Sequence, residues 1–190
     1  MKKLEGKVTV MTGAGCGYGM SSGFPGIFAK EGSHLVLNHY RQDPEGMKEF
    51  KEGLEACGVK VVLVEGDISD ESVAKKLIDT AVEEFGRIDV LINCAGISNP
   101  KLLTEITTEE WNRMIAVDLT SNYFTCKYAV PVMIKQKSGR IINIASPVSY
   151  THLDVYKRQL QGRAGLSLRE SVLRGRRPLS EPDTKINGKS

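Results

Sequence analysis

The segment TGAGCGYG at residues 12–19 contains four glycines and could hold a phosphate group. It directly follows the apolar run KVTVM and opens a stretch with helical spacing. Glycines let the backbone approach a pyrophosphate closely, and the N-terminus of the following helix offers it free N–H groups and a positive dipole. The segment therefore predicts a dinucleotide-binding turn; the alternative is a tight strand-to-helix turn without a ligand.

Two further polar motifs stand at the ends of later apolar runs. Asp67 and Ile68 follow VKVVLVEG, and NCAG at residues 93–96 follows IDVLI. The carboxyl ends of parallel strands share one edge of a sheet, and ligands of open α/β sheets bind there. Each motif alone is a common strand-ending turn, but their order and spacing predict that all three line one crevice.

The segments that must position these motifs alternate between short β-rich runs and longer runs of helical period. The helical period is clearest in residues 71–86, where apolar residues fall on one face and charges on the other. This alternation predicts an α/β fold, with a doubly wound, mostly parallel sheet of Rossmann type and helices on both faces. The expected strands are KVTVMTG (7–13), HLVLN (34–38), VKVVLVEGD (59–67), IDVLINCAG (88–96) and GRIINIAS (139–146).

The first expected helix, residues 17–30, conflicts with its own composition. It contains Gly23, Pro25 and Gly26. A proline inside a helix costs about 3 kcal/mol, and each glycine costs up to about 1 kcal/mol. We therefore expect a kinked or shortened helix, or an erroneous codon.

Residues 1–146 resemble the N-terminal part of the short-chain dehydrogenase/reductase family, near its 3-oxoacyl-carrier-protein reductases and sugar dehydrogenases. TGAGCGYG matches the family pattern TGxxxGxG, GDI matches its adenine-contacting turn, and NCAG matches NNAG with Cys94 at the second asparagine. The resemblance implies hydride transfer between a nicotinamide and a carbonyl or alcohol substrate. It implies cofactor contacts from Thr12, Gly13, Cys16, Gly17, Tyr18, Gly19, Arg41, Asp67, Ile68, Asn93, Ala95 and Gly96.

The resemblance also implies two catalytic positions. RIINIAS matches the family strand that carries the serine orienting the substrate oxygen, which falls on Ser146. A family tyrosine acts as general acid or base, with its pKa lowered by a lysine and by the cofactor's positive charge. The family's asparagine holds a water of the proton relay, and that position is Asp118 here, in VDLTS. Asp118 can replace the asparagine if the water is held by the backbone carbonyl. The negative charge of its side chain, however, would shift the pKa of the tyrosine upward.

The cofactor type is predicted from the turn after the second expected strand. An acidic side chain there would bond the ribose hydroxyls of NAD, and a basic one would pair with the additional phosphate of NADP. The turn NHYR at residues 38–41 ends in Arg41 and contains no acid. This favours NADP, with NAD possible; the alternative is that Arg41 is only a solvated loop residue.

The family's YxxxK pair is missing after the serine. The family spacing places the pair near Gln159 and Arg163, and neither Tyr150 nor Tyr156 is followed by lysine four residues later. Tyr and Lys at the ends of YFTCK, residues 123–127, precede the serine and are expected to be neighbours on a helix. Without the pair, the chain as written would at most bind the dinucleotide.

The stretch VSYTHLDVYKRQ at residues 148–159 has an explanation at the level of DNA. Its codons can be chosen so that, with the end of a proline codon before them, they form a perfect inverted repeat. Such a repeat resembles two abutting copies of a transposon end used in preparing sequencing libraries. We therefore expect a Rossmann domain at residues 1–146, incomplete after its fifth strand, and a non-native junction with a largely disordered tail at 147–190. The alternative is a genuine loop of unusual composition.

Composition argues against several other classes of function. The chain's net charge of +3 comes from its end, because residues 160–190 carry seven basic and three acidic residues. We therefore expect no nucleic-acid partner. The apolar runs are too short to cross a membrane, and the four cysteines lack metal-ligand spacing. These features predict a cytoplasmic protein without a metal. The family resemblance implies that the intact parent acts on a small carbonyl or alcohol substrate and forms a homo-oligomer.

Overall fold

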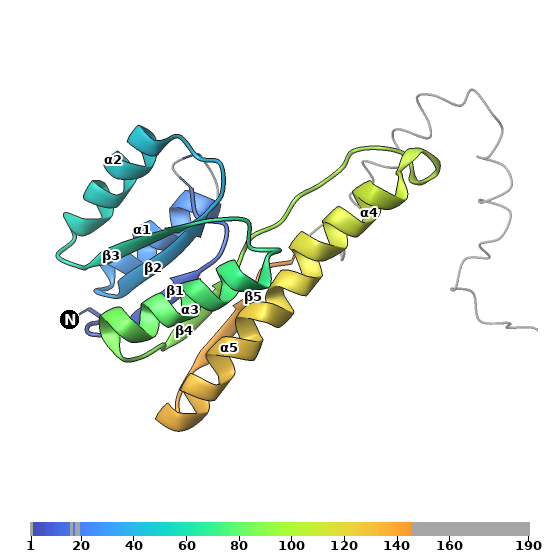
Figure 1. The fold of residues 1–190 in the computed structure, drawn as a ribbon. Coiled ribbons are helices and arrows are strands. Elements are labelled where there is room, and N and C mark those ends of the chain that lie inside the picture. Colours follow the sequence, from blue (N-terminus) through green and yellow to red (C-terminus); the bar gives the residue numbers. More distant parts are fainter. Residues whose placement is uncertain (1, 16, 18–19, 146–190) are drawn as a thin grey trace, which may run out of the picture. The chain divides into compact units, whose positions relative to one another are not determined.

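The computed structural model describes residues 2–15, 17 and 20–145. They form a five-stranded sheet of order β3-β2-β1-β4-β5, in which every neighbouring pair is parallel (Figure 1). This confirms the predicted parallel α/β sheet. The strands are β1 (Val8–Met11), β2 (His34–His39), β3 (Val61–Glu65), β4 (Val90–Asn93) and β5 (Arg140–Asn143). The helical segments are α1 (Met20–Lys30), α2 (Pro44–Glu55), α3 (Glu71–Phe85), η1 (Leu103–Glu105), α4 (Thr108–Ile115), η2 (Ala116–Thr120) and α5 (Ser121–Gln136).

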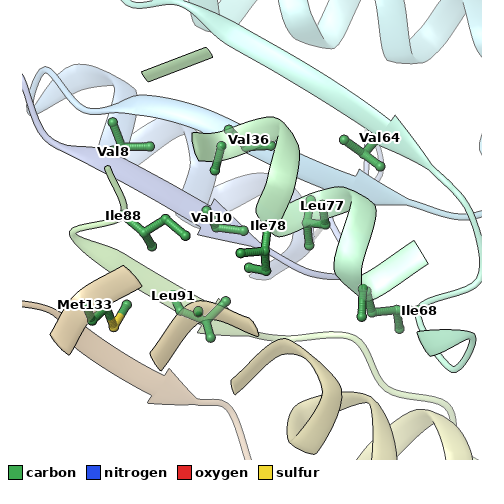
Figure 2. Packing of buried hydrophobic residues seen from close by; sticks show 13 residues of the cluster. Val8, Val10, Val36, Val64, Ile68, Leu77, Ile78, Ile88, Leu91 and Met133 are labelled. Atoms are coloured by element: carbon green, nitrogen blue, oxygen red, sulfur yellow. The ribbon is translucent and has the colours of Figure 1, made fainter. Parts of the chain in front are cut away.

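Two apolar cores lie on opposite faces of this sheet. Side chains alternate between the faces along a strand, so Val36 joins one core, whereas Leu35 and Leu37 join the other. The first core packs β-strand residues against α3 and α5, as Figure 2 shows for Leu77, Ile78 and Met133. The second core packs the sheet against α1 and α2. Each face is thus covered by a pair of helices, as right-handed βαβ crossovers require.

Local signals in the sequence fix where α3 begins and ends. The side chain of Asp70 accepts a hydrogen bond from the backbone N–H of Ser72 at 2.8 Å and caps the first turn. Gly86 ends the helix in the left-handed conformation, with φ of 71°. The helix therefore presents its buried residues to the sheet in one fixed register.

Helix α1 accommodates the predicted conflict in an unexpected way. It runs through Gly23, Pro25 and Gly26, so proline lies inside the helix. Pro25 has no N–H to give to the carbonyl of Ser21. That carbonyl instead accepts the backbone N–H of Gly15, at 3.3 Å. The proline thus frees an acceptor that ties the glycine-rich turn to the helix after it. The described helix begins at Met20, later than the predicted residue 17.

The segment from α4 to α5 is one long helical stretch interrupted by a π-helical turn, η2 (Figure 1). In this turn the N–H of Ser121 bonds to the carbonyl of Ala116, five residues earlier. A π turn changes how side chains before and after it are aligned around the axis. The sequence predicted a helix here but not this turn. Among the described residues, no helix has the length and apolar character needed to cross a membrane.

Candidate nucleotide-binding site

The first and third polar motifs meet at the carboxyl edge of the sheet. The hydroxyl oxygen of Thr12, after β1, accepts the backbone N–H groups of Cys94 and Ala95, after β4, both at 3.1 Å. Gly13 has φ of 69°, and a Cβ at this position would lie 2.6 Å from the Cα of Ala95. Only glycine fits such an approach without a shift of backbone. The two loops therefore form one continuous surface.

Asn38 joins the end of β2 to this surface. Its amide nitrogen donates to the carbonyls of Val64 and Gly66, at 3.3 and 2.9 Å, and its amide oxygen lies 3.5 Å from the N–H of Gly13. The side chain is buried, so these bonds hold three strand ends together in a site that water does not reach. Asn38 was not singled out from the sequence, although a lone polar residue inside the apolar run HLVLN is a signal for it.

Asp67 lies in the loop after β3 and is held from two sides. Its Oδ1 accepts the backbone N–H and the hydroxyl of Ser69, at 3.0 and 2.7 Å, and its Oδ2 pairs with Arg113 of α4 at 2.7 Å. Burial raises the pKa of Asp67, but the hydrogen bonds from Ser69 and Arg113 outweigh it, and the pKa lies below its ordinary value. The carboxylate is therefore ionised near neutral pH and acts only as an acceptor.

The predicted cofactor residues Ile68 and Asn93 are both buried. Ile68 packs in the core beneath α3. The amide of Asn93 donates to Asn143 of β5 at 2.9 Å and accepts the hydroxyl of Thr125 of α5 at 2.8 Å. These side chains hold the crevice together from inside. Contacts from them to a bound nucleotide would come through the backbone.

Asp118 reaches the same edge from the π-helical turn. Its Oδ1 accepts the backbone N–H of Ile97 at 2.9 Å, and it lies 3.6 Å from where a Cβ on Gly96 would be. Asp118 therefore holds the loop after β4, beside the predicted residues Ala95 and Gly96.

Arg41 stands at the turn after β2, where the cofactor type was predicted. It has φ of 51°, and its guanidinium lies over the ring of Tyr40, 4.9 Å from the centroid. The nearby acid, Asp43, is occupied as the N-cap of α2, because its side chain accepts the N–H of Gly46 at 2.7 Å. The turn thus presents a cation to the crevice edge.

Several predicted residues lie outside the part that the structure describes. They are Cys16, Tyr18, Gly19 and Ser146, together with residues 147–190. Gly17 is described, and a Cβ there would meet no atom of another described residue within 4 Å. Within the described ranges, no cluster of His, Cys, Asp and Glu could hold a metal ion.

A separate hollow of about 340 Å³ lies on the α2 side of the sheet. None of the predicted site residues that the structure describes lines it. Its walls are His39, Gln42, Pro44, Met47, Lys48, Lys51, Leu63 and Glu65.

Comparison with known sequences points to one family. The profile of the family described as short chain dehydrogenase matches residues 7–157. An uncharacterized oxidoreductase of Thermotoga maritima is 40% identical over 143 residues, which are 75% of this chain and 54% of that protein. Glucose 1-dehydrogenase 2 of Bacillus subtilis is 36% identical over 76% of this chain and 56% of its own length. A 3-oxoacyl-acyl-carrier-protein reductase of T. maritima is 34% identical over 77% and 58%.

Solved structures agree with this result. A crystal structure assigned to the short-chain dehydrogenases/reductases of Burkholderia xenovorans superposes with a TM-score of 0.72 and 32% identity, over 80% of this chain and 58% of that one. A double mutant of a Serratia marcescens short-chain dehydrogenase/reductase superposes with a TM-score of 0.70 at 24% identity, a likeness of fold alone, over 78% and 58%. The chain therefore spans a little over half the length of the relatives that it matches.

Proposed function

The chain belongs to the short-chain dehydrogenase/reductase family, and from that premise we propose that residues 1–146 are the nucleotide-binding part of an oxidoreductase that prefers NADP to NAD. The observation that carries the proposal is the junction of Thr12 and Gly13 with Ala95, because it brings the glycine-rich turn and the NCAG loop to one crevice. Ligands of open α/β sheets bind at such an edge.

The residues present fit a dinucleotide. The left-handed Gly13 and the open Gly17 leave backbone free to approach a pyrophosphate. The ionised Asp67 offers an acceptor at the loop after β3, where the family contacts adenine. Arg41 forms no ion pair with another described residue, and its charge supports NADP, since Asp43 is occupied as the cap of α2.

When bound, NADP would supply the hydride acceptor or donor. Ser146 would orient the oxygen of a carbonyl or alcohol substrate, and Asp118 would keep the loop after β4 in place through its bond to Ile97. No residue of this chain fills the role of the family's general acid or base, because neither Tyr150 nor Tyr156 is followed by a lysine four residues later.

We propose that residues 147–190 do not belong to the parent protein and that the chain as written has no turnover. The family profile extends to residue 157, and thus into VSYTHLDVYKRQ, but no YxxxK follows Ser146. The inverted repeat that can encode this stretch supports a junction formed in the DNA. Sequencing the source DNA across codons 140–165 without a transposon step tests this, and a sequence that again encodes VSYTHLDVYKRQ would contradict it.

We also propose that the parent is a cytoplasmic homo-oligomer. The exposed face of the α4–α5 stretch carries large apolar residues four positions apart, the spacing of one helix face, and such faces are typical of association surfaces. They are Trp111, Ile115, Leu119 and Tyr123.

Binding and turnover measured on the same purified chain test the main proposal. We expect NADPH to bind more tightly than NADH, and we expect no oxidation of NADPH with aldehyde or ketone substrates. Fluorescence titration measures the first quantity and loss of NADPH absorbance the second. NADPH oxidation that disappears in Ser146→Ala would show that the chain as written is a working enzyme. It would overturn the proposal that this chain has no turnover.

A further inference from the structure

We propose that Arg113 is a positioning residue, which holds the Asp67 carboxylate as the acceptor for the adenine amino group and thereby ties the adenine end of the site to the helix that carries Asp118. This inference rests on the proposed dinucleotide binding. It concerns α4, which supplied none of the residues predicted from the motifs.

The contacts of Arg113 have the form of a clamp. One guanidinium nitrogen pairs with Oδ2 of Asp67 at 2.7 Å, and the other donates to the hydroxyl of Ser69 at 2.6 Å. Ser69 in turn donates that hydroxyl to Oδ1 of Asp67 at 2.7 Å. Arg113 therefore fixes the carboxylate directly and through Ser69. A planar guanidinium with several donors in a fixed fork suits this arrangement, whereas a lysine ammonium could not reproduce it.

The clamp leaves Asp67 able to bind a ligand. An ionised carboxylate has about four lone-pair sites, and the contacts from Ser69 and Arg113 do not use all of them. A carboxylate accepts hydrogen bonds only, so it suits the amino group of adenine. It does not suit the carbonyl that hypoxanthine carries at the same position. Asp67 would therefore make the site prefer adenine to hypoxanthine, its deaminated form, provided that the carboxylate is held in its orientation.

The same helical stretch makes a second contact with the crevice. Asp118, five positions after Arg113, accepts the N–H of Ile97 in the loop after β4. In a regular α-helix, with 3.6 residues per turn, side chains five positions apart point in nearly opposite directions and do not share one face. Asp118 itself belongs to the π-helical turn η2, Ala116–Thr120, and this turn alters its alignment relative to Arg113. One helix therefore holds the loops after β3 and β4 together.

The test compares affinities for NADPH and for its analogue with hypoxanthine in place of adenine, measured on the full chain by quenching of Trp111, its single tryptophan. We expect the wild-type chain to prefer adenine by about tenfold, the effect of one hydrogen bond to a charged group. Arg113→Gln should bring this ratio close to one, and Arg113→Lys should give an intermediate ratio. Asp67→Asn should abolish the preference, because an amide can donate to the hypoxanthine carbonyl.

Lys127→Gln is the matched control. It removes an ion pair to Glu71 of similar length, 2.6 Å, on the same helical stretch and away from Asp67. A merely structural role for Arg113 would lower both affinities equally and leave the ratio unchanged, as we expect for Lys127→Gln. A tenfold adenine preference that persists in both Arg113 variants overturns this inference alone. Failure of the wild-type chain to bind NADPH overturns the proposed function and this inference with it.

Discussion

β1 and β5 belong to the same sheet, yet they differ in what the chain places around them. All four residues of β1 are buried, because β2 and β4 flank it and helices pack on both faces. All four residues of β5 are exposed, and within the described residues it pairs only with β4. The half of the sheet that supplies the nucleotide site is thus enclosed, whereas the half that leads to Ser146 is open.

The open strand has the composition of a buried one. Ile141 and Ile142 are 39% and 41% exposed, and the outer edge of β5 has no partner strand among the described residues, which makes it a template for aggregation. A further element beside β5 would cover the two isoleucines and pair with the edge of the strand. The comparison therefore teaches that cofactor binding and catalysis depend on different parts of the fold, and that only the first part is enclosed by residues described here.

The largest expected effect in the enclosed half is that of Gly13→Ala. A Cβ there would lie 2.6 Å from the backbone of Ala95, and φ is 69°. We expect a loss of about 4 kcal/mol in the free energy of unfolding, from left-handed strain and a backbone clash, with loss of NADPH binding. Urea unfolding and fluorescence titration measure the two effects.

Gly86→Ala is the control for strain alone. Gly86 has nearly the same φ, 71°, but a Cβ there would meet no atom of the described part of the chain within 4 Å. The expected cost is about 1 to 2 kcal/mol, with nucleotide binding unchanged. Equal costs at Gly13 and Gly86 would show that the contact between the glycine turn and the loop after β4 is not tight.

The second prediction compares two isoleucines that are partners in the sheet register, Ile92 of β4 and Ile142 of β5. Ile92 is 2% exposed and Ile142 is 41% exposed. We expect Ile92→Ala to cost about 3 kcal/mol, as a buried truncation does, and Ile142→Ala to cost less than about 1 kcal/mol. Urea unfolding measures both. Similar costs would mean that β5 is covered in solution, by a second copy or by residues 147–190, and would remove the contrast between the two strands.

The difference between the two halves also explains what the sequence could predict. The strands and their parallel direction followed from apolar runs separated by helical periods, although the order of the strands in the sheet was not predicted. The loops around Thr12, Asp67 and Asn93 followed from polar motifs at strand ends. Arg113 could not be found in this way. Its role depends on α4 lying across the loop after β3, and its position in the sequence carries no sign of that. The π-helical turn was equally hidden, because local periodicity cannot distinguish one extra residue per turn.

The smallest expected effect concerns a polar atom in the enclosed half that lacks a partner. His39, at the end of β2, is 8% exposed, and its Nδ1 has no hydrogen-bond partner among the described residues. Burial lowers the pKa of His39, and the nearby charge of Glu65 only partly opposes this. The folded protein therefore takes up a proton at lower pH than the unfolded chain, whose histidine titrates near 6.5.

Stability should accordingly fall as the pH drops below about 6.5, because the unfolded state binds more protons there. We expect His39→Leu to flatten this part of the curve, with little change at pH 8, where histidine is neutral in both states. Urea unfolding of the wild-type chain and of His39→Leu between pH 8 and pH 5.5 measures the difference in slope. An unchanged slope in His39→Leu would show that His39 has a partner in solution, and that the enclosed half satisfies this group too.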